Sequence, residues 1–235
     1  MKAPFKFLND LISPWREYVI EFFGTFLFVF FASSVVVVSG SYDNLGILPI
    51  SLVIGFSYVA LVYGCCKLSG GFLNPTITIA LWLTRKISGV RTVFYLISQV
   101  AGSFLAAGFI VVIFGSNALN IQLGGPVLGL GVLPQTALLI EAVVSGGLVF
   151  VVFATMFDKR GNFGMGPLAA GLYLVATTVV FWPVSGASFN MVRAIGPLVL
   201  SHSYSALAIF IIGPLIGSLM AIVYEYVFVE TDKKK

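Results

Sequence analysis

Charged side chains are scarce in this chain of 235 residues: Asp, Glu, Lys and Arg together make up 9% of it. A soluble globular domain carries about 25% of these residues, so the composition excludes a water-soluble fold. Hydrophobic residues make up 59% of the chain, and the mean hydropathy is +1.05. The composition therefore predicts a membrane protein, with residues 1–235 forming a single membrane domain that has little mass outside the bilayer.

Cysteine and histidine are also rare, with two cysteines and one histidine in the whole chain. A disulfide framework needs separated cysteines, whereas Cys65 and Cys66 are neighbours in an apolar run and are interpreted as small apolar side chains. The sequence contains no pattern typical of a nucleophilic triad, a metal cluster or a phosphate-binding loop. We therefore expect neither an enzyme nor a protein with a cofactor, a metal ion or a nucleic-acid partner.

Long apolar runs dominate the sequence instead. A spanning helix needs roughly 20 mainly apolar residues. Six segments qualify, at about residues 16–38, 48–68, 91–114, 134–157, 167–184 and 204–229. The pair Trp182-Pro183 is expected to end the fifth of them early. Two further apolar stretches, 75–84 and 191–200, have ten residues each. Ten residues make about 15 Å of helix, which is half of a bilayer core, so these stretches cannot span.

A short polar phrase occurs twice, just before each of the ten-residue stretches. Residues 69–74 read SGGFLN and residues 185–190 read SGASFN, so the serine, the first glycine and the asparagine recur 116 residues later. Each half of the chain, about 16–114 and 134–229, then holds three spans, and an odd number of spans inserts the second half upside down. The sequence predicts an all-α membrane protein with six transmembrane helices and two re-entrant half-helices in an inverted repeat.

Basic residues are unevenly shared between the two sides that this topology defines. Twelve of the 13 lie in the termini or in segments 67–91 and 158–162, which share one side. Cytoplasmic loops carry an excess of Lys and Arg, so both termini are expected in the cytoplasm. The exception is Arg193. An arginine at membrane depth is functional by default, so we expect it at a constriction; the alternative is an arginine that reaches the outer interface.

The repeated phrase suits two loops that meet at the bilayer midplane. Irregular backbone is tolerated at that depth only where it is buried in protein or lines a water-filled cavity. Asn74 and Asn190 are each expected to cap a half-helix through the side-chain oxygen, which leaves the amide N–H groups free to donate into the cavity. Pro75 suits the first helical position, and both half-helices would point their positive dipole ends at the midplane.

Together these motifs resemble those of the aquaporins, the major intrinsic protein family, over about residues 16–229. The stretches that carry the resemblance include SGGFLNP at 69–75, DKRGNFGMGPLAAG at 158–171 and RAIGP at 193–197. The resemblance implies an aquaporin-like fold and a passive channel for water that excludes protons and ions. It also implies a homotetramer in the lipid bilayer.

The chain departs from the family at its two Asn-Pro-Ala boxes. The boxes here are Asn74-Pro75-Thr76 and Asn190-Met191-Val192. Methionine is a good helix former, so the second half-helix is expected to survive the loss of its proline. The flexible methionine side chain is expected to alter the packing between the two loops.

The resemblance also assigns four side chains to an outer constriction. They are Ile54, Thr178, Ala187 and Arg193. Strict water channels of the family usually carry Phe and His at the first two of these positions. The smaller Ile54 and Thr178 imply a wider filter, which leaves open a facilitator of glycerol, urea or peroxide besides the water channel.

Two carboxylates, Glu21 and Glu141, lie early in the first and fourth spans. The symmetry and the resemblance favour a structural role in which each accepts hydrogen bonds from the loop backbone of its own half. A proton relay through either carboxylate is the alternative, and it would make the protein a coupled secondary transporter. A further alternative, prompted by Met191, is a closed membrane-packing protein that conducts nothing.

Overall fold

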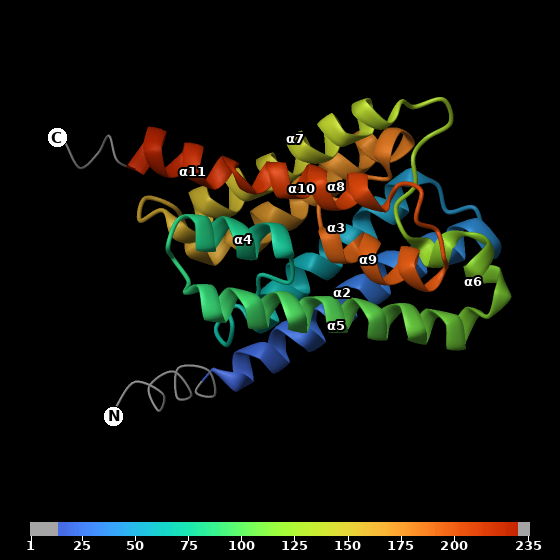
Figure 1. Ribbon diagram of the computed structural model, residues 1–235, viewed down its shortest axis with the longest axis horizontal. Helices are drawn as coiled ribbons and strands as arrows, with labels where there is room; N and C mark the ends of the chain where they lie inside the picture. Colours follow the sequence, from blue (N-terminus) through green and yellow to red (C-terminus); the bar gives the residue numbers. More distant parts are fainter. Residues whose placement is uncertain (1–13, 230–235) are drawn as a thin grey trace.

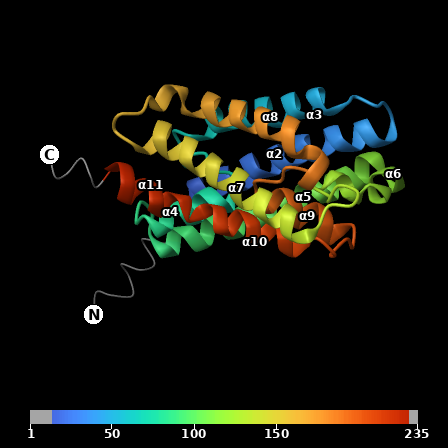
Figure 2. The same ribbon diagram turned by 90° about the horizontal axis from the view of Figure 1, so that it is seen from above.

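The computed structural model describes residues 14–229, and within that range the chain folds into helices with no strand. Six helical segments are long and apolar enough to cross a membrane, as the sequence predicts. They are Trp15–Ser41, Ile47–Cys65, Gly89–Phe114, Pro134–Phe157, Phe163–Ser185 and Leu207–Val229. These segments run roughly side by side along the long axis of the molecule (Figures 1 and 2).

Individual elements divide these spans as follows. The longest helices are α2 (Trp15–Ser41), α3 (Ile47–Cys65), α5 (Gly89–Phe114), α7 (Pro134–Val152), α8 (Gly166–Ser185) and α10 (Leu207–Ser218). The shorter helices are α4 (Pro75–Leu83), α6 (Ser116–Asn120), α9 (Met191–Leu200) and α11 (Met220–Tyr224). Two 3-10 turns, η1 (Gln122–Gly124) and η3 (Phe163–Met165), and two π-helical turns, η2 (Phe153–Phe157) and η4 (Glu225–Val229), complete the set.

The fifth span shows where the sequence expectation is wrong, because α8 passes through Pro183 and continues to Ser185. Proline lacks an N–H group, but in the last turn of a helix it removes only one hydrogen bond. The helix then ends at Gly186, whose φ of 70° lies in the left-handed region and whose N–H donates to the Trp182 carbonyl. This glycine cap, rather than the proline, sets the end of the helix.

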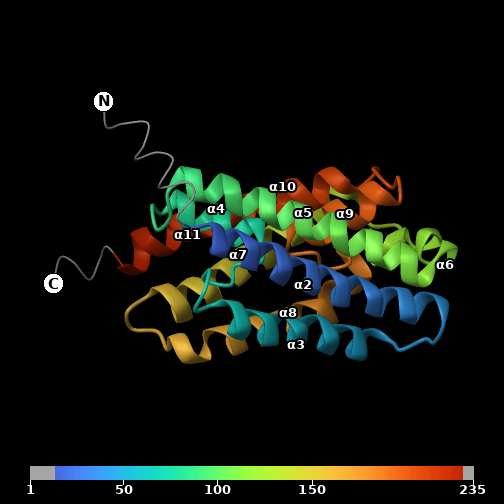
Figure 3. The same cartoon turned by 90° about the horizontal axis from the view of Figure 1, so that it is seen from below.

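Two ends of the bundle can be told apart. Helix α2 begins at Trp15 and η4 ends at Val229 at the same end, which we call the terminal end; α6 lies at the opposite end (Figure 3). The loop 66–74 enters from the terminal end and the loop 186–190 enters from the opposite end. Helices α4 and α9 run back outward from these loops, so their N-termini face each other inside the bundle (Figure 1).

Glycines allow the helices to approach closely. A Cβ atom built on Gly55 of α3 would lie 2.6 Å from the carbonyl oxygen of Gly171 on α8, and the reverse distance is also 2.6 Å. A Cβ atom on Gly217 of α10 would lie 2.7 Å from the backbone nitrogen of Gly146 on α7. A side chain at Gly55, Gly171 or Gly217 would clash at these crossings, which fix the frame around the two loops.

The distribution of side chains is that of a protein in lipid. Large apolar side chains cover the outside; Val112 is 84% exposed and Leu139 is 65% exposed. The interior instead buries polar groups, among them Glu21, Glu141 and Arg193, each 0% exposed. Because buried polar groups need partners, the interior contacts of the two loops define the candidate site.

Candidate functional site

A buried glutamate of α2 holds the first re-entrant loop. Glu21 accepts hydrogen bonds from the Ser69 hydroxyl at 2.7 Å and from the backbone N–H groups of Phe72 and Leu73 at 3.0 and 2.8 Å. Loop backbone at membrane depth has no water to satisfy it, so the carboxylate supplies the acceptors.

A glutamate of α7 holds the second loop in the same way. Glu141 accepts from the Ser185 hydroxyl at 2.6 Å and from the backbone N–H groups of Ser188 and Phe189, both at 2.9 Å. Each donor stands 116 residues after its counterpart in the first loop. Each carboxylate thus accepts hydrogen bonds from one hydroxyl and two backbone N–H groups around the loop of its own half.

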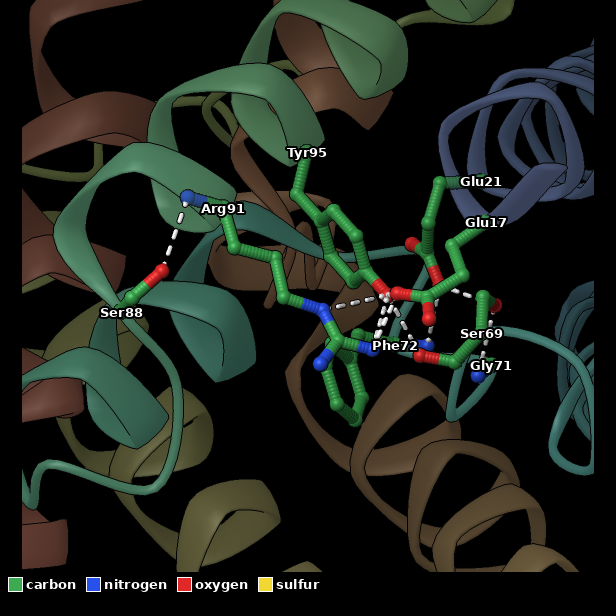
Figure 4. A network of polar contacts seen from close by, with 8 residues as sticks. All are labelled: Glu17, Glu21, Ser69, Gly71, Phe72, Ser88, Arg91 and Tyr95. Carbon is green, nitrogen blue, oxygen red and sulfur yellow. Dashed lines mark hydrogen bonds and ion pairs between the residues drawn. The ribbon is translucent and has the colours of Figure 1, made fainter. Parts of the chain in front are cut away.

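A second layer of support, which sequence reasoning missed, braces the first loop from the terminal end (Figure 4). The Tyr95 hydroxyl lies 2.7 Å from Glu17 Oε2 and 2.8 Å from the Ser69 carbonyl oxygen. Arg91 donates to the same hydroxyl at 3.3 Å and forms an ion pair with Glu17. The signal in the sequence is the pair of opposite charges, Glu17 at the start of the first span and Arg91 at the start of the third.

Helix α5 also contacts both halves of the repeat through two buried polar side chains. Gln99 Nε2 donates to Glu21 at 2.8 Å. The Ser103 hydroxyl donates to the Val192 carbonyl oxygen and accepts from the Gly196 N–H at 2.9 Å. One helix of the first half therefore anchors a glutamate of its own half and the half-helix of the other.

Both asparagines of the repeat cap their half-helices. Asn74 Oδ1 accepts from the Thr76 N–H at 2.9 Å, and Asn190 Oδ1 accepts from the Val192 N–H at 3.1 Å. The amide groups are less free than the sequence suggested. Asn74 Nδ2 donates across the junction to the Phe189 carbonyl at 3.0 Å, and the Asn190 amide makes the mirror-image bond. Each amide has two N–H groups, so one remains for a further partner.

The residues just before the asparagines adopt left-handed backbone conformations. Leu73 has φ 49° and Phe189 has φ 42°, a region that side chains other than glycine rarely occupy. Each has its N–H bound by the glutamate of its own half and its carbonyl bound by the asparagine of the other half. Strained backbone persists where surrounding contacts over-determine it, typically at functional sites.

The departures from the family boxes leave both half-helices intact. Pro75 stands at the first position of α4 and Met191 at the first position of α9. The preceding asparagines have almost the same backbone angles, −154° and 115° for Asn74 and −149° and 117° for Asn190. Thr76 and Val192 are fully buried at the second positions. The second half-helix therefore forms without the proline.

Arg193 lies in the first turn of α9 and is 0% exposed. Its Nη1 donates to the carbonyl oxygens of Gly186 and Ala187 at 2.9 and 3.1 Å, and its guanidinium carbon lies 5.5 Å from the centre of the Trp182 ring. Within residues 14–229, Nε and Nη2 have no hydrogen-bond partner. A buried guanidinium with two unpaired nitrogens is costly in a dry interior, so these donors are suited to a polar molecule that passes them.

The other three residues assigned to the outer constriction are also fully buried. Ala187 is joined to Arg193 by the hydrogen bond to its carbonyl group. Ile54 on α3 and Thr178 on α8 are 0% exposed on neighbouring helices, and the Thr178 hydroxyl has no partner among the described residues. Ile54 and Thr178 make no hydrogen bond to Arg193. No group of three or more His, Cys, Asp and Glu side chains in residues 14–229 is placed to hold a metal ion.

Comparison with known proteins matches the chain to the family model described as "Major intrinsic protein" over residues 9–224. It is 33% identical to "Aquaporin TIP2-3" of Arabidopsis thaliana over 227 residues, covering 93% of this chain and 89% of that protein. It is 31% identical to "Aquaporin-4" of Mus musculus over 219 residues, covering 91% of this chain and 68% of that protein.

Among solved structures, the fold is similar to that of the aquaglyceroporin from Plasmodium falciparum. The TM-score is 0.84 at 21% sequence identity, and the match covers 94% of this chain and 100% of that one. At this identity the match speaks for the fold alone. With its six spans and these relatives, the chain is an integral, multi-pass membrane protein.

Proposed function

The chain belongs to the major intrinsic protein family, and we propose that it is a passive channel, not an enzyme, which conducts water down osmotic gradients while excluding protons and ions. One observation carries this proposal: Arg193 is completely buried beside the second loop with two nitrogens that no described residue satisfies. A file of water molecules would accept hydrogen bonds from these nitrogens, which would offset the cost of burying the cation.

The midplane junction supplies the next partners along the path. Asn74 and Asn190 each keep one amide N–H beyond the bond that joins the loops. Helices α4 and α9 both direct the positive ends of their dipoles at this point. Water can accept from the amides in passing, whereas a proton or another cation meets the two dipoles and Arg193.

We propose that Ile54, Thr178, Ala187 and Arg193 together form the selectivity filter. Arg193 and the Thr178 hydroxyl offer hydrogen bonds, while the side chains of Ile54 and Ala187 are apolar and form none. Such a mixture lets water exchange partners without being held. The burial of all four residues and the bond between Arg193 and the Ala187 carbonyl support this assignment.

A second candidate function is a facilitator of glycerol, urea or peroxide. It is favoured by the absence of an aromatic residue from all four filter positions and by the small side chains at Ile54, Thr178 and Ala187. Re-swelling of shrunken proteoliposomes in glycerol distinguishes the two candidates. A water-selective pore leaves the vesicles shrunken, whereas a facilitator lets them recover rapidly.

The sidedness and assembly of the channel are parts of the same proposal. We place the terminal end in the cytoplasm because the topology predicted from the sequence assigns 12 of the 13 basic residues to that side. We expect the functional unit to be a homotetramer in lipid, each chain contributing one membrane domain with its own pore. Protease access to the termini in sealed cells tests the first statement, and native mass measurement in lipid nanodiscs tests the second.

Substitution of Arg193 tests the proposed function, because the burial of this side chain with unpaired nitrogens is the observation that supports it. Arg193→Ala should admit glycerol and urea and should raise proton leak, because it removes both the charge and the side chain that narrows the filter. Arg193→Lys keeps the charge but not the fork of donors, so it should restore proton exclusion better than solute exclusion. Unchanged solute and proton permeability in Arg193→Ala would remove this residue from the filter.

A further inference from the structure

A small cavity lies on the terminal side of Asn74, between the first loop and helices α3, α7 and α8. The centre of a water molecule can occupy about 10 Å³ of this cavity. The cavity therefore has room for about one water molecule. The side chains that line it are mostly apolar and include Val62, Phe72, Ile77, Val152, Met156 and Ala170. On the proposed path, a permeant that has passed the asparagines crosses this point in single file.

The polar atoms around the cavity are few. Gly70 and Gly71 contribute backbone atoms, and Tyr58 contributes a hydroxyl. That hydroxyl already donates to the Phe72 carbonyl oxygen at 3.2 Å. Water inside the cavity therefore gains few hydrogen bonds in exchange for those it leaves behind.

Phe72 is the bulkiest side chain that the first loop contributes to this lining, and it is held firmly. Its ring covers Gly70, where a Cβ atom would lie 2.5 Å from the ring. The ring centre lies 5.6 Å from that of Tyr95 and 6.2 Å from that of Phe157. The braced Tyr95 stands next to it in Figure 4. The backbone N–H of Phe72 is bound by Glu21, which holds the loop, and the rings of Tyr95 and Phe157 pack against the phenyl ring.

The inverted repeat provides an internal comparison. Ser188 stands 116 residues after Phe72, and the N–H groups of both residues donate to the glutamate of their own half. The two residues thus occupy the same place in two equivalent loops. Ser188 carries a hydroxyl, which donates to the Asn190 carbonyl at 3.0 Å, whereas Phe72 carries a phenyl ring. The two halves of the path therefore differ in polarity at matched positions.

We propose that Phe72 forms a second constriction, an apolar collar that sets the rate at which water passes the terminal half of the pore. The inference rests on the proposed function and adds to it a rate-determining residue outside the filter. Apolar constrictions oppose conduction by dewetting, and a single file broken at one point limits the whole path. The filter at Arg193 then decides which molecules pass, while the collar decides how fast water does.

Phe72→Ser tests the proposal directly because it installs the residue that the other loop carries. Wild type and variant are reconstituted at equal protein content, and water permeability is measured by stopped-flow light scattering at several temperatures. The variant should be about threefold to tenfold more permeable, the gain expected for one hydrogen bond recovered at the barrier, and its permeability should depend less on temperature. Phe56→Ser is the matched control, because Phe56 lies on α3 at 52% exposure toward lipid; its permeability should stay at the wild-type value.

The outcomes separate this inference from the proposed function. A conducting wild type with an equal or slower Phe72→Ser variant overturns the collar and leaves the channel standing. A wild type at the rate of bare liposomes with a conducting Phe72→Ser variant supports a collar that closes the pore. If neither conducts, both proposals fall. Should Phe72→Ser not fold, Phe72→His takes its place: it keeps a flat ring of similar size but adds polar nitrogen atoms, and an unchanged rate in it overturns the collar.

Discussion

Asn190 Nδ2 donates to the carbonyl oxygen of Leu73 at 2.9 Å, which joins the two loops through residues that are 117 positions apart in the chain. The mirror-image bond from Asn74 to Phe189 makes the junction twofold. Each asparagine therefore has two tasks, since its oxygen caps one half-helix while its nitrogen ties that half-helix to the opposite loop. The stability of the pore and its geometry depend on the same two side chains.

Asn190→Ala should destabilise the protein by about 2–4 kcal/mol, because it removes a cap worth about 1 kcal/mol and leaves the Leu73 carbonyl unsatisfied at about 1–3 kcal/mol. Thermal unfolding in detergent measures the effect. Asn120→Ala is the control, since Asn120 is exposed at the opposite end, and it should change stability by no more than about 0.5 kcal/mol. Equal stability of the two variants would contradict the dual role of Asn190.

Glu141→Gln should lower the free energy of unfolding without changing how water flux responds to a pH gradient. The amide keeps one acceptor oxygen but turns an N–H group toward loop donors, at a cost of about 1–3 kcal/mol for each donor left unpaired. Water flux in wild type and variant should be the same with and without an imposed pH gradient.

The control for this substitution is Glu225→Gln, which breaks a partly exposed ion pair with Lys86 worth no more than about 1 kcal/mol. A wild-type flux that follows the proton gradient, and loses that dependence in Glu141→Gln, would establish the coupled transporter instead.

Met191→Pro should stabilise the protein by about 0.4–1 kcal/mol by restricting the unfolded chain. Proline fits the first helical position, and the backbone angles of Asn190 already match those of Asn74 before Pro75. Water permeability should stay within about twofold of wild type, since the half-helix forms with either residue. The reverse substitution, Pro75→Met, is the matched control and should destabilise by a similar amount. A wild-type protein that does not conduct, together with a Met191→Pro variant that does, would support the closed-protein alternative.

Ala187→Cys should make water flux sensitive to mercurials, because the residue is buried beside Arg193 on the proposed path. Wild type should be blocked only weakly, with Cys65 buried and Cys66 half-buried away from this filter. Ala101→Cys, at an exposed position of α5, should leave the flux unblocked. Insensitivity of Ala187→Cys would place Ala187 outside the pore lining.

The fold was predictable because its determinants are local. Run length sets the six spans, a ten-residue stretch is too short to cross, and an asparagine before a proline predicts a capped half-helix at residue 75. The prediction that Pro183 ends the fifth span was wrong, because the end of that helix is set by the left-handed Gly186.

Contacts between distant segments were not predictable in the same way. The cross-loop bonds of Asn74 and Asn190 require two loops to meet with a defined orientation, which no local pattern encodes. The brace formed by Glu17, Arg91 and Tyr95 joins two helices through side chains whose individual positions look ordinary in sequence. The role proposed for Phe72 likewise depends on the cavity that its ring lines together with residues of distant helices, and the sequence does not show that cavity.

The most direct test of the account combines an osmotic and a proton gradient in one experiment. Proteoliposomes of the wild-type chain, loaded with a pH-sensitive dye, are mixed with an impermeant osmolyte at a lower external pH. We predict shrinkage much faster than that of bare liposomes, with the internal pH drifting no faster than theirs. Shrinkage at the bare-liposome rate, or acidification that keeps pace with water, would contradict a proton-excluding water path past Arg193.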